Sequence, residues 1–79
     1  MKIKTKNPRF KIRLISVVVP AYKQEKTIVR DLNLIKSVLD KLRYKTELIC
    51  VIDGKDDKTF ERASKFAQRF KNVRIVGYE

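Results

Sequence analysis

The sequence contains no histidine, no tryptophan and a single cysteine among its 79 residues. Without histidine, the chain lacks the side chain that most often serves as a general base and as a metal ligand. One cysteine excludes an internal disulfide and a cysteine-based zinc site. Acidic residues are also scarce: 9 Asp and Glu oppose 20 Lys and Arg, which gives a net charge of +11. The length allows one small domain at most, and its core would be marginal.

Long apolar runs are absent as well. A secretory signal peptide needs an apolar region of about 7–15 residues, and in the one candidate, residues 14–22, Pro20 ends the apolar run. Nothing approaches the roughly 18 apolar residues of a membrane span. These absences predict a cytoplasmic, reducing setting, in which Cys50 is a small buried apolar residue.

The positive charge is concentrated at the N-terminus. Residues 1–13 carry six lysines and arginines and no acid, and we treat them as a basic N-terminal arm before a folded part at residues 14–79. Such an arm can attract the phosphates of nucleic acid or of anionic lipid. A solubilising terminus has the same composition, so both interpretations stay open.

Three short apolar runs predict strands, at residues 14–19, 48–52 and 73–76. The first run is continuous and rich in β-branched residues, which favours a strand that is buried on both faces of a parallel sheet and ends at Pro20.

Two amphipathic helices are predicted between these strands, because apolar residues recur there at spacings of three and four. The first stripe lies within residues 25–43 and the second within residues 56–70. The alternating order predicts a Rossmann-like, three-layer βαβαβ half-domain of the α/β class, with a parallel sheet and right-handed crossovers. The stripe residues are Ile28, Leu32, Ile35, Leu39 and Leu42, then Phe60, Ala63, Ala67 and Phe70.

Two loops, residues 20–25 and 53–59, follow the first two predicted strands. The carboxyl ends of parallel strands meet at one edge of a sheet, so these loops can flank a single ligand. Tyr22 offers an aromatic surface to a base or sugar, and Asp53 can accept hydrogen bonds from a nucleobase or a ribose. Gly54 permits close approach of the backbone.

A purely structural interpretation of the same loops is also open: Pro20 as a strand terminator, Asp53 and Gly54 as a turn, and Asp56 and Asp57 as acids at a helix start. The glycine-rich fingerprints of dinucleotide-binding proteins and P-loop NTPases are absent, which weighs against both classes. A response-regulator receiver would need an acidic pair directly after the first strand, where this chain has Pro20 and Ala21.

Taken together, three segments of the chain resemble the start of a family-2 glycosyltransferase. They are ISVVVPAYKQEKTI, ELICVIDGKDDKTFERA and NVRIVGYE. Members of that family have the GT-A fold, with a strand that ends Pro-x-Tyr-Asn-Glu and a second strand that ends Asp-Asp-Gly-Ser-x-Asp-x-Thr. The resemblance covers about residues 14–79 and is nearest to the dolichol- or polyprenyl-phosphate sugar transferases.

This resemblance implies a set of site residues. Pro20, Ala21 and Tyr22 fall on the loop that cradles the nucleotide. Asp53 falls on the acidic position that contacts the uracil or ribose, and Gly54 matches the turn after it.

Other positions depart from the family pattern. Lys23 replaces the usual Asn, and Gln24 stands where many members have the loop Glu. Glu25 lies one place later and can substitute for it. Ile52 replaces the first Asp of the pair, and Lys55 replaces Ser.

The resemblance further implies transfer of a sugar from a nucleotide-diphosphate sugar to a lipid-phosphate or glycan acceptor. In the family, an Asp-x-Asp motif that binds Mg²⁺ or Mn²⁺ and a catalytic carboxylate come later in the chain. We therefore expect an N-terminal fragment, inactive alone, without catalytic or metal-binding residues of its own. The basic arm suggests peripheral attachment at the cytoplasmic face of an anionic membrane.

The alternative hypothesis is a small basic nucleic-acid-binding α/β module. High positive charge favours it, but the aromatic residues do not interleave with the basic ones as a stacking platform requires.

Overall fold

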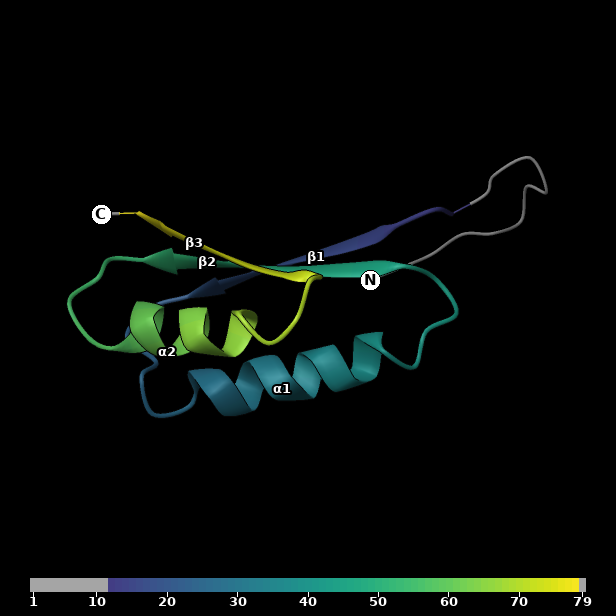
Figure 1. The fold of residues 1–79 in the computed structure, drawn as a ribbon. Helices are drawn as coiled ribbons and strands as arrows, with labels where there is room; N and C mark the ends of the chain where they lie inside the picture. The colour runs from purple at the N-terminus through teal and green to yellow at the C-terminus, as the bar shows by residue number, and fades with distance from the viewer. Residues whose placement is uncertain (1–11, 79) are drawn as a thin grey trace.

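A computed structural model describes residues 12–78 of the chain, so residues 1–11 of the predicted basic arm lie outside the described range. The elements alternate between strand and helix (Figure 1). This confirms the predicted βαβαβ order. In sequence they are β1 (Ile15–Ala21), α1 (Ile28–Leu39), β2 (Thr46–Asp53), α2 (Thr59–Ala67) and β3 (Val73–Tyr78).

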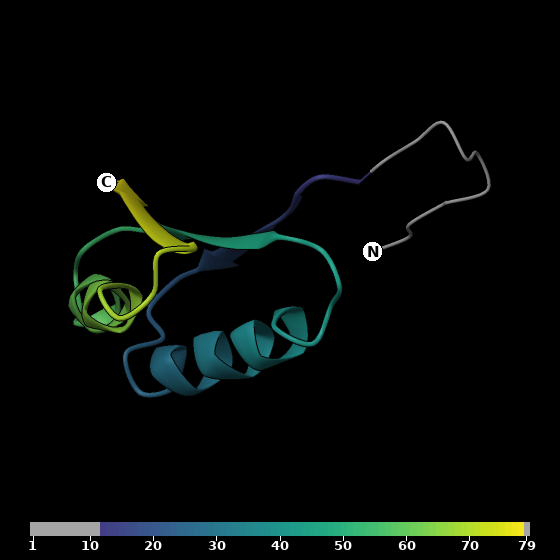
Figure 2. The same cartoon turned by 45° about the vertical axis from the view of Figure 1, so that its right-hand side comes forward.

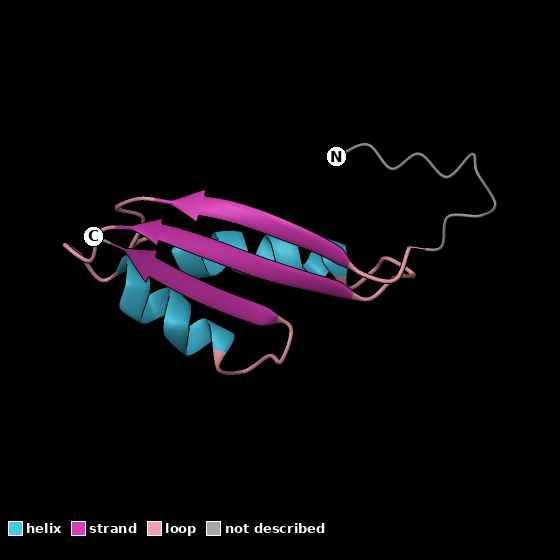
Figure 3. Ribbon diagram, turned by 90° about the horizontal axis from the view of Figure 1, so that it is seen from above, coloured by secondary structure: helices cyan, strands magenta, loops and turns pink. Residues whose placement is uncertain are grey.

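The three strands form one parallel sheet in the order β1-β2-β3. Val19 of β1 lies opposite Cys50 of β2, which lies opposite Ile75 of β3. Both helices cover the same face of this sheet (Figures 1 and 3). The β1–α1–β2 and β2–α2–β3 crossovers step in the same direction across the sheet. When such crossovers have the same handedness, their helices lie on the same face of the sheet. The Rossmann-like half-domain is therefore confirmed, and the described residues form two of its three layers.

The strands are buried on one face only, which corrects the prediction for the first strand. In β1, Ile15 and Ala21 face the helices and are buried, whereas Val18 is 61% exposed. Val76 of β3 is also exposed on the open face. A continuous apolar run indicates that both faces suit burial, but burial itself requires a covering layer on each side.

The strand β1 also runs through Pro20, which had been expected to end it. Pro20 lies opposite Val51 of β2, and the strand ends one residue later at Ala21. Within the described residues β1 is an edge strand. Proline is tolerated on an edge strand because the N–H that it lacks would point away from the neighbouring strand and would donate no hydrogen bond within the sheet.

The core lies between the sheet and the two helices. Cys50 at its centre is fully buried, as predicted, and burial raises the pKa of its thiol to about 11, so the side chain stays neutral. The other buried apolar residues of the core cluster are Ala21, Ile28, Leu32, Leu39, Leu48, Ile52, Ala63, Phe66 and Val73.

Both helices are shorter than the periodicity predicted. After α1 the chain turns back toward the sheet, which leaves Leu42 exposed. In α2, Ala63 is buried and Phe60, Ala67 and Phe70 are partly buried against the core, so all four residues of the predicted stripe face it. Thr59 and Phe66 are buried as well, so the buried face is wider than the stripe. Neither helix in the described part of the chain is long and apolar enough to cross a membrane.

Candidate functional site

The two predicted loops meet at the carboxyl edge of the sheet (Figure 3). The β1–α1 loop leaves after Ala21, which lies opposite Ile52 of β2. The β2–α2 loop leaves after Asp53, which lies opposite Tyr78 of β3. The parallel register thus brings the ends of all three strands to one place.

The first three predicted site residues have different surroundings. Pro20 is exposed on β1, and Tyr22, directly after the strand, is 56% exposed. Ala21 is 5% exposed and belongs to the core, so its side chain packs against the protein. Only Pro20 and Tyr22 can offer side chains to a ligand; Ala21 can offer its backbone.

At the end of β2, Asp53 is exposed and Gly54 turns the chain. Gly54 has a φ of +83°, a left-handed conformation that glycine adopts without steric cost. Its N–H donates a hydrogen bond of 2.6 Å to the carbonyl oxygen of Tyr78. The turn therefore holds the β2–α2 loop against the end of β3 and leaves the Asp53 carboxylate at the surface.

Thr59 joins the two loops. Its side chain is almost fully buried, and its hydroxyl oxygen accepts a hydrogen bond of 2.8 Å from the N–H of Gln24. The N–H of Thr59 donates to Asp57 Oδ1 at 3.0 Å. Hydrogen bonds from the Thr59 hydroxyl and N–H hold the pKa of Asp57 below its ordinary value of 3.8. A chain of hydrogen bonds therefore runs from Asp57 through Thr59 to Gln24.

Arg62, in the first turn of α2, makes a second connection to the β1–α1 loop. Its guanidinium donates a hydrogen bond of 2.7 Å from Nη1 to the carbonyl oxygen of Glu25. The Glu25 side chain is partly buried at this point. Sequence reasoning had placed Glu25 in the site but missed Arg62, because nothing in the pattern marks a contact between residues this far apart.

Lys23 has an unusual backbone conformation. With a φ of +45°, it is the one non-glycine residue of the described range at positive φ. Its ammonium lies 5.3 Å from the centre of the Tyr22 ring. A hydrogen bond and charge interaction with Tyr22, followed by the carboxylates of Asp56 and Asp57, raise the pKa of Lys23. This loop is therefore cationic at its tip.

A hollow of 320 Å³ lies along the β1–α1 loop. It is lined by Lys23, Gln24, Glu25, Lys26, Thr27 and Asp57.

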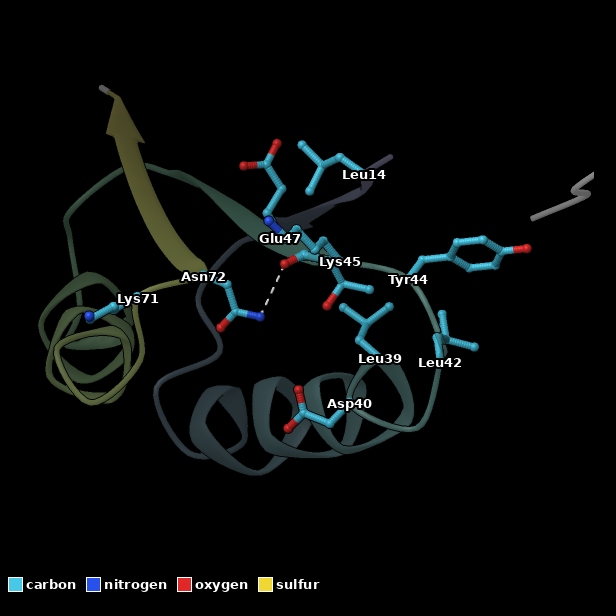
Figure 4. Close-up of a pocket in the computed structure, with 10 residues that line it drawn as sticks. Leu14, Leu39, Asp40, Leu42, Tyr44, Lys45, Glu47, Lys71 and Asn72 are labelled. Carbon is cyan, nitrogen blue, oxygen red and sulfur yellow. Dashed lines mark hydrogen bonds between the residues drawn. The ribbon is translucent and has the colours of Figure 1, made fainter. Parts of the chain in front are cut away.

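A larger cavity, of 510 Å³, lies at the opposite end of the sheet (Figure 4). Its lining mixes the acids Asp40 and Glu47 with Lys45, Lys71 and aliphatic side chains. Ligands of open parallel α/β sheets bind outside the carboxyl ends of the strands, whereas this cavity lies at their amino ends, beside Lys45, Thr46 and Asn72. We therefore place the candidate site at the loops, although the hollow there is smaller.

Carboxylates are present at the loops but do not form a metal centre. Asp53, Asp56 and Asp57 belong to one short segment. No three groups of the His, Cys, Asp or Glu type converge anywhere in residues 12–78. The residues described do not fit an all-protein site for a divalent ion, and we derive no step through one.

Comparison with known proteins places the chain in a family. The sequence profile of glycosyl transferase family 2 matches residues 16–77. This range contains all five structural elements apart from Ile15, the first residue of β1, and Tyr78, the last residue of β3. The chain belongs to glycosyl transferase family 2. The resemblance to a family-2 glycosyltransferase, drawn from the loop motifs, is thereby confirmed.

Two curated relatives of the family match 78% of the chain each. One, 33% identical over 67 residues, is the dolichyl-phosphate beta-glucosyltransferase of Trichomonas vaginalis. The other, 32% identical over 62 residues, is an uncharacterized glycosyltransferase of Synechocystis. The chain spans 20% of the length of each relative. No solved structure matches the chain.

Proposed function

We propose that this family-2 chain supplies the nucleotide-binding half of an enzyme that transfers a sugar from a nucleotide-diphosphate sugar. One observation carries the proposal: Thr59 ties the β1–α1 loop to the start of α2 at the carboxyl edge of the sheet, the edge at which β2 ends in the exposed Asp53. Doubly wound α/β sheets bind nucleotides outside this edge. The family membership supports the same reaction.

In this proposal, different residues of the loops contact different parts of the nucleotide sugar. The exposed Tyr22 ring packs against the base or sugar. The Asp53 carboxylate accepts hydrogen bonds from a nucleobase N–H or a ribose hydroxyl, which are charge-assisted and therefore strong. Pro20 stiffens the entry to the loop, and Gly54 lets the backbone approach the ligand. Glu25, tied to Arg62 through its carbonyl oxygen, borders the hollow.

Transfer itself needs groups that the described residues do not assemble. A divalent ion such as Mg²⁺ or Mn²⁺ would neutralise the departing diphosphate. A carboxylate would deprotonate the acceptor hydroxyl. We propose that both come from parts of the enzyme other than residues 12–78, and that the 79-residue chain binds nucleotide without transferring sugar.

A curated relative and the N-terminal charge bear on the acceptor and the location. One relative is named for dolichyl phosphate, which suggests a lipid-linked acceptor here. The basic residues 1–13 would favour an anionic surface at the cytoplasmic face of a membrane. Residues 1–11 of that arm lie outside the described range.

Calorimetric titration of the 79-residue chain with UDP and GDP, with and without Mg²⁺, tests the nucleotide site. Asp53→Asn should weaken binding of the preferred nucleotide by about 10- to 100-fold, the usual value of hydrogen bonds to a charged group. Asp56→Asn removes the same charge from the same loop and serves as the matched control.

Equal affinities for wild type and Asp53→Asn would remove Asp53 from the site. Tight, steeply salt-dependent binding of DNA, with no effect of either nucleotide, would favour the nucleic-acid-binding module instead.

A further inference from the structure

A stripe of basic residues runs along α2, from the residue before its first turn to the turn after its last residue. It consists of Lys58, Arg62, Lys65 and Arg69, all exposed. Their spacings of four, three and four residues place them on one face of a helix. We call this set the α2 basic stripe.

The stripe is not neutralised by the rest of the described chain. The salt bridges of residues 12–78 join Arg30 to Asp31 and Lys36 to Asp40, so no described carboxylate oxygen lies within 4.0 Å of a charged nitrogen of the stripe. Glu61 is the neighbouring acid on α2, and it lies about 100° around the helix from Arg62. An exposed, charged helical face is usually stabilised by pairs of opposite charge, whereas the α2 basic stripe carries positive charge only.

Two of the four basic side chains are also held in place. Arg62 donates to the carbonyl oxygen of Glu25 at 2.7 Å, which leaves its other donors free. The guanidinium of Arg69 lies 5.3 Å from the centre of the Phe70 ring. Because these two side chains are already ordered, less conformational entropy is lost when they bind an anion.

Beside the stripe, an apolar groove of 250 Å³ separates α2 from α1, which lies next to it in Figure 2. Val29 of α1 is 42% exposed on one side, and Phe66 of α2 forms the floor with 3% exposed. Arg62, Lys65 and Arg69 complete the lining. The groove therefore has an apolar base and a cationic wall.

We propose that the α2 basic stripe and this groove dock on the surface of an anionic phospholipid bilayer. The lysines and arginines meet the phosphate and carboxylate groups of the lipid heads. The groove takes the apolar part of one lipid at the headgroup boundary. This combination of a line of cations beside one short apolar depression matches a molecule with an anionic head and an apolar tail.

Two other classes of partner fit these observations less well. Single-stranded nucleic acid would need an exposed aromatic ring for stacking, and Phe66 in the groove is almost fully buried. An acidic partner helix would need a row of anchor pockets at helical spacing, whereas the groove is a single depression. The lipid proposal does not depend on the sugar-transfer proposal, since neither Tyr22 nor Asp53 takes part in it.

Co-sedimentation of the 79-residue chain with vesicles tests the proposal. Vesicles of phosphatidylserine and phosphatidylcholine are compared with pure phosphatidylcholine at physiological ionic strength. The variant K58Q/K65Q/R69Q leaves Arg62 and its contact with Glu25 intact. Each basic residue near an anionic surface contributes about fivefold to partitioning, so this variant should bind about a hundredfold more weakly.

The matched control is K41Q/R43Q/K45Q, which also removes two lysines and one arginine. All three are exposed, and they lie between α1 and β2, in a segment that contributes no residue to the stripe or to the groove. At this ionic strength, charges more than about 8 Å from the membrane are largely screened. The control should therefore lose no more than about threefold, and circular dichroism should show both variants folded like wild type.

Three results would overturn the proposal. Equal losses in the two triple variants would mean that net charge alone drives retention. Full retention by K58Q/K65Q/R69Q with loss only on deletion of residues 1–13 would assign the membrane contact to the N-terminal arm. Tighter binding of duplex DNA than of vesicles, with the same dependence on Lys58, Lys65 and Arg69, would assign the stripe to nucleic acid.

Discussion

The N–H of Gln24 donates a hydrogen bond of 2.8 Å to the hydroxyl oxygen of Thr59, a residue 35 positions later in the chain. Gln24 belongs to the loop after β1, and Thr59 begins α2 after β2. Gln24 also accepts hydrogen bonds at its carbonyl oxygen from the N–H groups of Thr27 and Ile28. The backbone of one residue, Gln24, thus holds both the start of α1 and the start of α2, and the two loops that meet there form the candidate site.

Replacing Thr59 by valine tests this connection. Valine keeps the shape of threonine but cannot accept from Gln24, so a partly buried N–H would lose its partner. We expect the free energy of unfolding in urea to fall by about 1–3 kcal/mol. Thr59→Ser keeps the hydroxyl and is the control, with a loss of about 1 kcal/mol for the missing methyl group. Equal losses in the two variants would show that packing, not the hydrogen bond, holds Thr59.

The Asp57 carboxylate should link stability to acid pH. Because hydrogen bonds from Thr59 lower its pKa in the folded chain below the ordinary 3.8, the folded state favours the ionised form. This contribution is complete about one pH unit above 3.8 and is lost as the pH falls through the folded pKa. Asp57→Asn should therefore show a shallower decline of unfolding free energy below about pH 4 than wild type.

Urea unfolding at a series of pH values measures this slope, with Asp56→Asn as a variant of the same charge. If Asp57→Asn keeps the wild-type slope while Asp56→Asn flattens it, the acid dependence belongs to Asp56 and the assignment to Asp57 is wrong.

Lys23 offers a test of backbone strain. Its φ of +45° lies in the left-handed region, which costs most L-residues roughly 1–2 kcal/mol and which asparagine tolerates better. This gives a physical reason for the family's usual Asn at the position. Lys23→Asn should raise the free energy of unfolding by about 0.5–1 kcal/mol. Lys26→Asn, at a residue with negative φ in the same loop, should give no gain, and a gain of equal size there would point to charge instead of strain.

The sequence alone predicted much of the fold, because local patterns determine it. The spacing of Ile28, Leu32 and Leu39 marks a helix whatever it packs against, and these three residues are buried. The two loops also reached one edge of the sheet as predicted, because parallel pairing places strand ends together.

What escaped prediction depends on partners distant in the chain. The exposure of Val18 follows from which face of the sheet the helices cover, and β1 passes through Pro20 because it is an edge strand. The ties from Thr59 to Gln24 and from Arg62 to Glu25 arise only once the two loops are side by side. No periodicity in the sequence encodes such contacts.

Gly77 near the end of β3 marks a close approach between the sheet and α2. A Cβ at this position would lie 2.5 Å from Cε2 of the Phe60 ring, closer than atoms can pack. Gly77→Ala should therefore lower the free energy of unfolding by about 1–3 kcal/mol, as overpacking does. In a Phe60→Leu background the same substitution should cost less, and urea unfolding of the four proteins gives the coupling energy.

Gly54→Ala separates this steric effect from backbone strain. A Cβ at Gly54 meets only the Asp56 side chain, at 3.8 Å, so its cost of about 1 kcal/mol or more comes from the φ of +83°. That cost should be the same with Phe or Leu at position 60. If Gly77→Ala also lowers the free energy of unfolding by the same amount with Phe or with Leu at position 60, Phe60 does not limit the approach of β3 to α2. The close packing of α2 against this strand would then need another explanation.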